Sequence, residues 1–145
     1  MKIGSYLFVI ILIALSCNTA KDKAEKNMVS SKNYTLQVEG IKNLMPPSDP
    51  GIKSVYTIIT ITAAETHEHK WKFKEAIISD SEKTYTLNKF DHNTYFDKGA
   101  KQIMTNLRGI PADINDKFSI EITLIDEDEK QLVLSKENIE MMVVH

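Results

Sequence analysis

The sequence has 145 residues, of which 42% are hydrophobic, 26% charged and 8% aromatic. This composition is typical of one globular domain and not of a disordered chain. The 18 lysine and arginine residues nearly balance the 20 aspartate and glutamate residues, for a formal net charge of -2. Without a basic excess to hold a phosphate backbone, nucleic acid is excluded as an expected partner. The single cysteine, Cys17, excludes an internal disulfide framework and an all-cysteine zinc site.

The chain begins with a short positively charged region and a run of ten apolar residues. Lys2 lies beside the amino terminus, the apolar run extends from Tyr6 to Leu15, and Ser16 and Cys17 follow. A membrane-spanning helix needs about 20 apolar residues, so this run matches the apolar segment of a secretory signal peptide instead. A buried first helix or strand is the alternative, but the run is not amphipathic and a polar segment follows it directly. The pattern therefore predicts a signal peptide over residues 1–16.

The residues around the cysteine resemble the lipobox of bacterial lipoprotein precursors. They read Ala14-Leu15-Ser16-Cys17; the family usually has leucine three places before the cysteine, where Ala14 stands here. The resemblance implies that the Cys17 thiol receives a diacylglycerol, that cleavage occurs before Cys17, and that the new amino terminus is acylated. Three acyl chains, at about 0.8 kcal/mol per buried methylene, would hold the protein on a membrane permanently.

The residues after the cysteine bear on the cellular location. Asn18 stands where the inner-membrane retention signal of enteric lipoproteins has an aspartate. Lys21-Asp22-Lys23 resembles the surface-export signals of Bacteroidetes lipoproteins, with one acid where those carry several. The resemblance thus implies the bacterial cell envelope and favours the outer membrane, with the periplasmic or surface face left open. The membrane, through lipidated Cys17, is the first expected partner, and no cofactor is expected.

A polar segment separates the cysteine from the rest of the chain. From Asn18 to Lys32 only Met28 and Val29 are sizeable apolar residues. Such a segment cannot bury enough apolar surface to offset the entropy of ordering. We expect residues 17–32 to form a lipid-anchored flexible tether and residues 33–145 to form one folded domain.

The domain shows strand periodicity almost throughout. Residues Phe118 to Leu124 alternate between apolar and polar side chains, as a half-buried strand requires. Val55 to Ala64 has apolar residues on both faces, which indicates a central strand. Further short strands are expected at Tyr34–Val38, Tyr85–Leu87, Ile103–Leu107, Leu132–Leu134 and Ile139–Val144.

One strand changes the phase of its apolar residues. Trp71 and Phe73 share a face, whereas Ala76 and Ile78 have the opposite parity. A β-bulge near Lys74-Glu75 would bring both pairs to the same side. Strands at this spacing, with no strong helical segment, predict an antiparallel immunoglobulin-like β-sandwich of about seven strands. The third strand carries the only tryptophan, as in immunoglobulin-like domains.

The segment His67-Glu68-His69 is the candidate metal site. Residues two apart in a strand point the same way, so both imidazoles can hold one metal ion. His92 or His145 would add a third ligand, with Glu65 or Asp91 as an oxygen donor. The alternative is a polar turn between the strands that contain Val55 and Trp71. We name His67 and His69 as candidate metal ligands and keep the turn as the rival interpretation.

Four consecutive carboxylates, Asp126 to Glu129, offer oxygen ligands to a hard cation such as calcium. The segment lacks the alternating donors and the glycine of a calcium loop. A tight hairpin between two strands explains it without a ligand and is the favoured interpretation.

The known catalytic patterns are absent from the sequence. There is no phosphate-binding glycine-rich loop and no G-x-S-x-G segment, and lipidation of Cys17 removes the one thiol. No catalytic residue is therefore named, and the chain is not expected to be an enzyme.

Three loops are the expected contact surfaces, and one of them contains an aromatic cluster. The cluster is Phe90, Tyr95 and Phe96, interpreted as a buried plug at one end of the sandwich, with an exposed recognition patch as the alternative. The plug predicts that Tyr95→Ala lowers the melting temperature. The loops are Leu44–Ile52, Glu65–Lys70 and Lys89–Gly99.

Together these patterns predict a lipid-anchored binding or assembly module of the cell envelope, whose partner is an envelope protein or a glycan. One alternative is a small periplasmic metal-dependent hydrolase that uses His67 and His69. The other is a protective, immunity-like lipoprotein that docks onto a toxin or an envelope enzyme.

Overall fold

The computed structural model describes residues 28–43, 55–91 and 95–144. The predicted signal peptide, Cys17, His92, His145 and the expected contact loop Leu44–Ile52 lie outside the described residues. Within the described ranges, no helix is long and apolar enough to cross a membrane.

The described chain is built almost entirely of strands, with one short 3-10 helix, η1 (Ser31–Asn33). The strands are β1 (Tyr34–Asn43), β2 (Val55–Ala63), β3 (Trp71–Ser79), β4 (Thr84–Leu87), β5 (Tyr95–Phe96), β6 (Gln102–Leu107), β7 (Lys117–Ile125) and β8 (Gln131–Val144).

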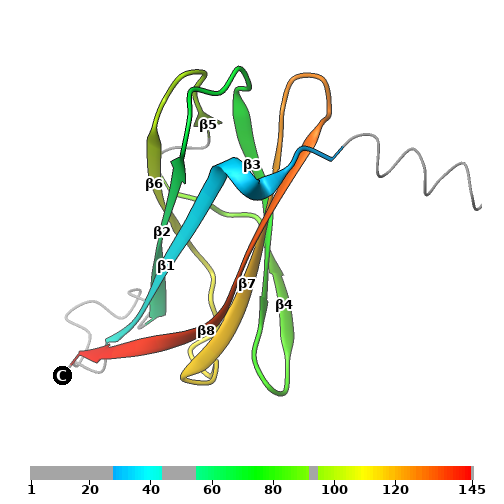
Figure 1. The fold of residues 1–145 in the computed structure, drawn as a ribbon. Helices are drawn as coiled ribbons and strands as arrows, with labels where there is room; N and C mark the ends of the chain where they lie inside the picture. Colours follow the sequence, from blue (N-terminus) through cyan, green and yellow to red (C-terminus); the bar gives the residue numbers. More distant parts are fainter. Residues whose placement is uncertain (1–27, 44–54, 92–94, 145) are drawn as a thin grey trace, which may run out of the picture.

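The strands form one curled sheet that folds over into two layers (Figure 1). Its hydrogen-bonded order is β4-β3-β7-β8-β1-β2-β6, with β5 also paired to β3. Strands β4, β3, β7 and the first half of β8 make one layer, and β1, β2 and β6 make the other. The predicted all-β, sandwich-like fold is confirmed. All strand pairs are antiparallel except one, in which Gly40–Asn43 of β1 runs parallel to Met141–Val144 of β8.

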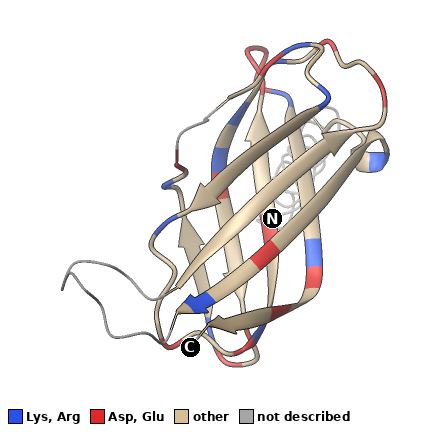
Figure 2. Cartoon of the chain, turned by 90° about the vertical axis from the view of Figure 1, so that its left-hand side faces the viewer, with Lys and Arg blue, Asp and Glu red and all other residues tan. Residues whose placement is uncertain are grey.

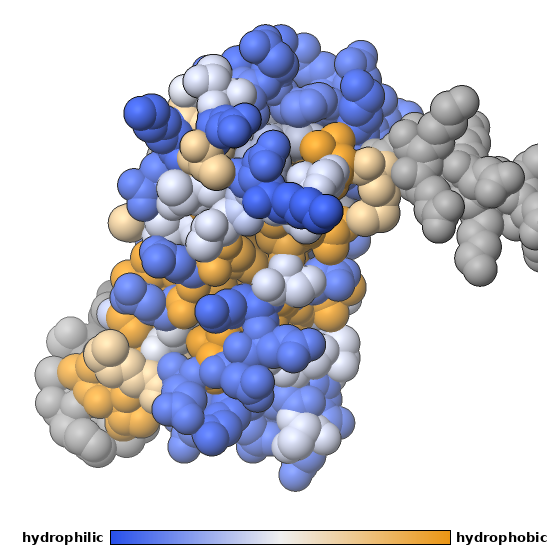
Figure 3. Space-filling view, in the orientation of Figure 1, coloured by the Kyte–Doolittle hydropathy of each residue, from blue (hydrophilic) through white to orange (hydrophobic). Residues whose placement is uncertain are grey.

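Alternating side chains of both layers fill the space between them. The largest side chain, Trp71 on β3, is fully buried, as expected for the tryptophan of this strand in immunoglobulin-like domains. The core also contains Ile59 and Ile61 of β2 and Ile122 and Leu124 of β7, all with no exposed surface. In Figure 3 apolar residues reach the surface across the middle of the molecule and at its lower left, and the upper end is mostly hydrophilic.

The predicted bulge in β3 is confirmed. The pairing of β3 with β7 shifts register between Phe73 and Glu75. As a result Phe73 before the bulge and Ala76 and Ile78 after it are all buried.

A second bulge bends β8 from one layer toward the other. Phe118 of β7 pairs with Ile139, but Ile120 pairs with Lys136, so two residues of β8 lie opposite one residue of β7. One of the two, Asn138, has a positive φ of 54°, in the left-handed region where asparagine is tolerated. Beyond this bend β8 reaches β1 and pairs with it in parallel.

The close approach of β1 to β8 requires a glycine. A Cβ atom on Gly40 would lie 2.8 Å from Sδ of Met141 and 2.9 Å from Cε1 of Phe118. Both distances are shorter than van der Waals contact, so a side chain at residue 40 would displace the Met141 or Phe118 side chain or push the strands apart.

Pairing at the amino-terminal side begins before β1. Met28 forms a parallel bridge with Gln131, and the Val29 amide donates to the Gln131 carbonyl oxygen at 2.7 Å. Val29 also packs against the core. Among the described residues, strand pairing therefore begins at Met28.

Candidate functional site

Both predicted histidines lie at one end of the sandwich, which we call the loop end. It is formed by the β2–β3 loop (64–70), the β7–β8 turn (126–130) and the start of β1 (Figure 1). Because β2 and β3 belong to different layers, the loop between them crosses the end of the sandwich and brings its side chains next to the β7–β8 turn.

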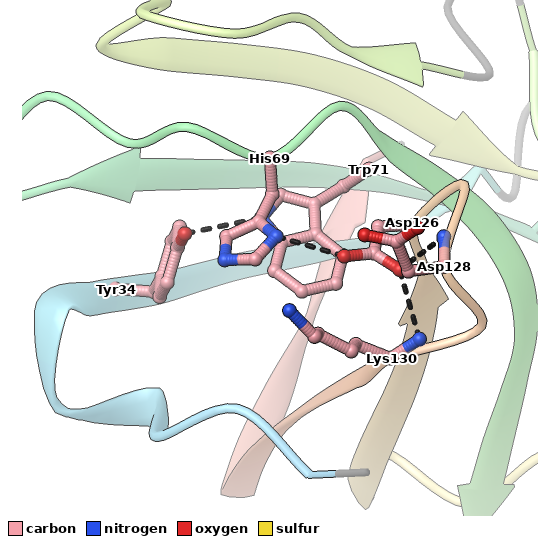
Figure 4. A network of polar contacts seen from close by, with 6 residues as sticks. All are labelled: Tyr34, His69, Trp71, Asp126, Asp128 and Lys130. Carbon is pink, nitrogen blue, oxygen red and sulfur yellow. Dashed lines mark hydrogen bonds and ion pairs between the residues drawn. The ribbon is translucent and has the colours of Figure 1, made fainter.

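His69 lies between a carboxylate and an indole ring (Figure 4). Its Nδ1 is 2.8 Å from Oδ2 of Asp126, and its ring stacks on Trp71 with centroids 4.7 Å apart. An ionised carboxylate only accepts hydrogen bonds, so the His69 proton in this contact is on Nδ1. The side chain of His69 is 28% exposed.

The Asp126 carboxylate is almost fully covered, with 5% of its side chain exposed. Its Oδ1 accepts hydrogen bonds from the backbone amides of Asp128 (2.9 Å) and Lys130 (2.8 Å). Burial raises the pKa of Asp126, but the hydrogen bonds from Lys130, His69 and Asp128 outweigh it and hold the pKa below its ordinary value. Asp126 is thus an ionised group that fixes the turn.

The interpretation of Asp126 to Glu129 as a hairpin turn is confirmed. The Asp126 amide donates to the Lys130 carbonyl oxygen at 3.0 Å, and the Glu129 amide donates to the Asp126 carbonyl oxygen at 3.2 Å. Glu129 has a positive φ of 61°. Both carboxylate oxygens of Asp126 have protein partners, which an incoming cation would have to replace.

The contact of His69 with Trp71 continues to β1. Trp71 Nε1 donates a hydrogen bond to the Tyr34 hydroxyl at 3.0 Å. A continuous chain of contacts, Tyr34–Trp71–His69–Asp126, therefore joins β1, β3, the β2–β3 loop and the β7–β8 turn. We call these four residues the latch.

His67 is directed elsewhere, into the end of the core. It is 8% exposed, and its Nε2 donates to the carbonyl oxygen of Ala100 at 3.0 Å. Its ring packs against Phe96, with centroids 4.5 Å apart, and edge-on against Tyr34 at 5.8 Å. Its Nδ1 is buried and has no hydrogen-bond partner among the described residues.

The structure thus gives the two candidate metal ligands different partners. Asp91, a proposed oxygen donor, is paired with Arg108, and Glu65 is exposed. Across residues 28–43, 55–91 and 95–144 no three His, Cys, Asp or Glu side chains are grouped to hold a metal ion. Metal binding by His67 and His69 stays a prediction, and it would require both imidazoles to leave their present contacts.

The aromatic cluster divides into buried and exposed members. Phe96 is 1% exposed, and Phe90 packs against Phe73 with centroids 4.9 Å apart. Tyr95 is 46% exposed, and the Lys70 ammonium lies 4.8 Å from its ring centroid. The plug interpretation is confirmed for Phe96 and is wrong for Tyr95, because neighbouring residues of a strand point to opposite sides.

The sequence did not reveal the latch. His69 and Asp126 are 57 residues apart, and Tyr34 and Trp71 each fit the apolar pattern of their own strand. The only available signal was the parity of His69 with Trp71, which places the two side chains on the same side of one extended segment.

Comparison with known proteins adds no assignment. The sequence matches no protein-family model and no curated protein. The function is therefore argued from the residues themselves.

Proposed function

We propose that this chain is a lipid-anchored, non-enzymatic binding module of the bacterial cell envelope. The anchor rests on the lipobox-like segment that ends at Cys17. The observation that carries the proposal is the pairing of Met28 and Val29 with Gln131, because it fixes the place where the anchored segment enters the sandwich.

The anchor would hold the sandwich close to the membrane. Eleven residue steps separate Cys17 from Met28, and a fully extended chain of that length spans at most about 40 Å. Met28 pairs with Gln131, directly after the β7–β8 turn, so the chain enters the sandwich at the loop end. The tether thus joins the sandwich at the loop end, which leaves the sides and the far end of the sandwich accessible to partners.

The latch supports this arrangement. It joins the strand that follows the anchor to the β7–β8 turn by the Trp71–Tyr34 and His69–Asp126 hydrogen bonds. These bonds hold the loop end of the domain together at the place where the tether joins it.

The hydrolase alternative has less support. It requires His67 and His69 to share a metal ion, whereas the ring of His67 contacts Ala100 and Phe96 and that of His69 contacts Asp126 and Trp71. A surface that binds an envelope protein or a glycan needs no such rearrangement.

The mass of the amino-terminal peptide of protein made in a bacterium that processes lipoproteins tests the anchor. The expected peptide begins at Cys17 and carries the added mass of the acyl chains. Cys17→Ser is expected to keep residues 1–16, and Ser16→Ala, which retains a small residue before the cysteine, is expected to be processed like the wild type. An uncut wild-type chain with a free thiol would refute the anchor.

The binding role is tested by chemical crosslinking of the wild-type chain in intact membranes. We expect a discrete adduct of higher mass that contains an envelope component. Only uncrosslinked chain, under conditions that crosslink a known envelope complex, would contradict this role.

A further inference from the structure

Three methionines of the domain are solvent-exposed. Met28, Met104 and Met142 are 54%, 59% and 57% exposed, although methionine is among the residue types most often buried. Of the four methionines among the described residues, only Met141 is buried, with 8% exposed. Met1 and Met45 lie outside the described residues. Three thioether groups of the domain are therefore in contact with water.

The position of each exposed methionine keeps its side chain out of the core. Met104 lies on β6 between two buried residues, and successive residues of a strand point to opposite faces. Met142 follows the buried Met141 near the end of β8 in the same way. Met28 is held through its bridge to Gln131. The buried core of the described chain contains none of the three exposed side chains.

Met104 and Met142 lie in the layer that contains β1 and β2. The register pairs Met104 with Thr60 and Met142 with Ile41. The strands of this layer are drawn in Figure 2 in the colour of uncharged residues over most of their length. An oxygen atom added to either sulfur would therefore place a polar group on a face that has few charges.

Met141 has the opposite surroundings, one residue away from Met142. A Cβ atom on Gly40 would lie 2.8 Å from Sδ of Met141, so this sulfur packs directly against β1. Protein interiors are close-packed, and an oxygen atom bound to this sulfur would have to displace its neighbours. Two adjacent methionines thus present the same thioether in covered and in open surroundings.

A thioether reacts with two-electron oxidants such as hydroperoxides. The hydroperoxide transfers one oxygen atom to sulfur: its O–O bond breaks, an S=O bond forms, and water or an alcohol leaves. Sulfur loses two electrons, and the peroxide oxygens gain them. The product, methionine sulfoxide, is polar and chiral, and methionine sulfoxide reductases convert it back to methionine.

We infer that Met28, Met104 and Met142 are reversible oxidation sites at which the folded domain reduces hydroperoxides. An oxygen atom on these sulfurs points into water and leaves the core and the strand pairing unchanged. The oxidised domain therefore stays folded, and its sulfoxides are open to a methionine sulfoxide reductase. This function goes beyond the proposed binding role and requires neither the lipid anchor nor a partner protein.

Site-resolved mass spectrometry of the full-length chain, folded in detergent and treated with hydrogen peroxide, tests the inference. We expect the sulfoxide to form at each of the three exposed methionines at least about tenfold faster than at Met141. In urea that unfolds the chain, the rate at Met141 should rise to that at Met142. Met1 and Met45 are measured separately and do not enter the comparison.

The oxidised chain should keep its fold. With the three exposed sites converted, we expect the melting temperature to stay within about 3 °C of that of the untreated chain. Incubation of the folded, oxidised chain with reductases for both sulfoxide epimers, and a dithiol as the reductant, should return the three residues to methionine.

Two leucine variants localise the reaction. Met142→Leu removes one exposed thioether and should remove only the fast oxidation at residue 142. Met141→Leu roughly conserves the volume of a core side chain and is the matched control. It should leave the oxidation rates of the three exposed methionines in the folded chain unchanged.

Three results would overturn the inference. The first is an oxidation rate in the folded chain, at any of the three exposed methionines, as slow as that at Met141. The second is unfolding that accompanies oxidation of the three sites while Met141 is still unmodified. The third is sulfoxides that the reductases cannot reduce in the folded chain. None of these measurements depends on lipidation of Cys17, so a failure here is distinct from a failure of the anchor.

Discussion

A single carboxylate, that of Asp126, connects the β7–β8 turn to the aromatic side chains of two other strands. It accepts from two backbone amides and contacts His69, which stacks on Trp71. Because only 5% of the Asp126 side chain is exposed, water screens the hydrogen bonds of its carboxylate only weakly. Loss of its charge is therefore expected to affect the whole latch.

Asp126→Asn should destabilise the domain in a pH-dependent way. The native pKa of Asp126 is lowered, so its contribution to stability is fully present above the unfolded-state pKa of about 3.9 and is lost as pH falls through the native pKa. We expect the variant to lose about 1–3 kcal/mol at neutral pH. Urea unfolding at a series of pH values should show this difference shrinking below about pH 4.

Asp128→Asn is the matched control, because the Asp128 side chain is exposed in the same turn. Asp128 bonds to Asp126 through its backbone amide, which the variant keeps. Its effect should be small at every pH. A difference between wild type and Asp126→Asn that stays constant down to pH 2 would contradict the role assigned to the Asp126 charge.

Truncation of Phe96 should lower the stability of the domain far more than truncation of Tyr95. Phe96 is 1% exposed, so Phe96→Ala leaves a cavity and should lower the free energy of unfolding by about 3–5 kcal/mol. Tyr95 is 46% exposed, and Tyr95→Ala should cost less than about 1 kcal/mol. Thermal unfolding of the two variants checks the assignment, and equal losses would disprove it.

At the scale of elements, the apolar pattern predicted most strands and even the bulge in β3. The phase change between Phe73 and Ala76 is visible in the sequence because both sides of the bulge must face the same core. The division of β8 between two layers was not predictable, since each half alternates as any strand does. The exposed run Ser135–Asn138 coincides with the bend, but only the pairing with β7 and β1 shows that β8 passes from one layer to the other there.

The latch was unpredictable for a related reason. The sequence identified His67 and His69 as a pair, whereas the fold gives each a different partner. Those partners, Ala100 and Asp126, lie 33 and 57 residues away. Strand periodicity reports which side of an element a residue faces, and it contains no information on which distant loop lies opposite.

Gly40→Val should weaken the pairing of β1 with β8. The first added carbon would already lie 2.9 Å from the Phe118 ring, so the strands must separate or the ring must move, at a cost of about 1–3 kcal/mol. Urea unfolding measures the loss. Glu39→Val, at an exposed neighbouring position of the same strand, is the control, and an equally small effect of both variants would contradict the close-approach argument.

At the scale of the whole molecule, the first and last strands of the described chain close the sandwich together. β1 pairs with β2 along nine residues and with the end of β8 along four. Most strand pairs join segments distant in sequence, a topology that predicts slow folding compared with helical domains of the same size.

Removal of residues after Glu140 should therefore destabilise the entire domain. The truncation deletes Met141, which is 8% exposed in the core, together with the parallel partner of Gly40–Asn43. We expect a loss of about 3 kcal/mol or more in the free energy of unfolding, measured by thermal denaturation. The full-length double variant Met142→Gln, Val143→Thr changes exposed side chains only and should unfold like the wild type.

The parallel pairing of β1 with β8 also has a mechanical consequence. Met28 and Val29 pair with Gln131 at the start of β8, and β8 ends at Val144 at the opposite end of the sandwich, so tension applied between these two ends would load this ladder lengthwise. The four residue pairs from Gly40↔Met141 to Asn43↔Val144 would then share the force in shear instead of opening one after another. A domain loaded in shear along this ladder is suited to stay folded while it is pulled.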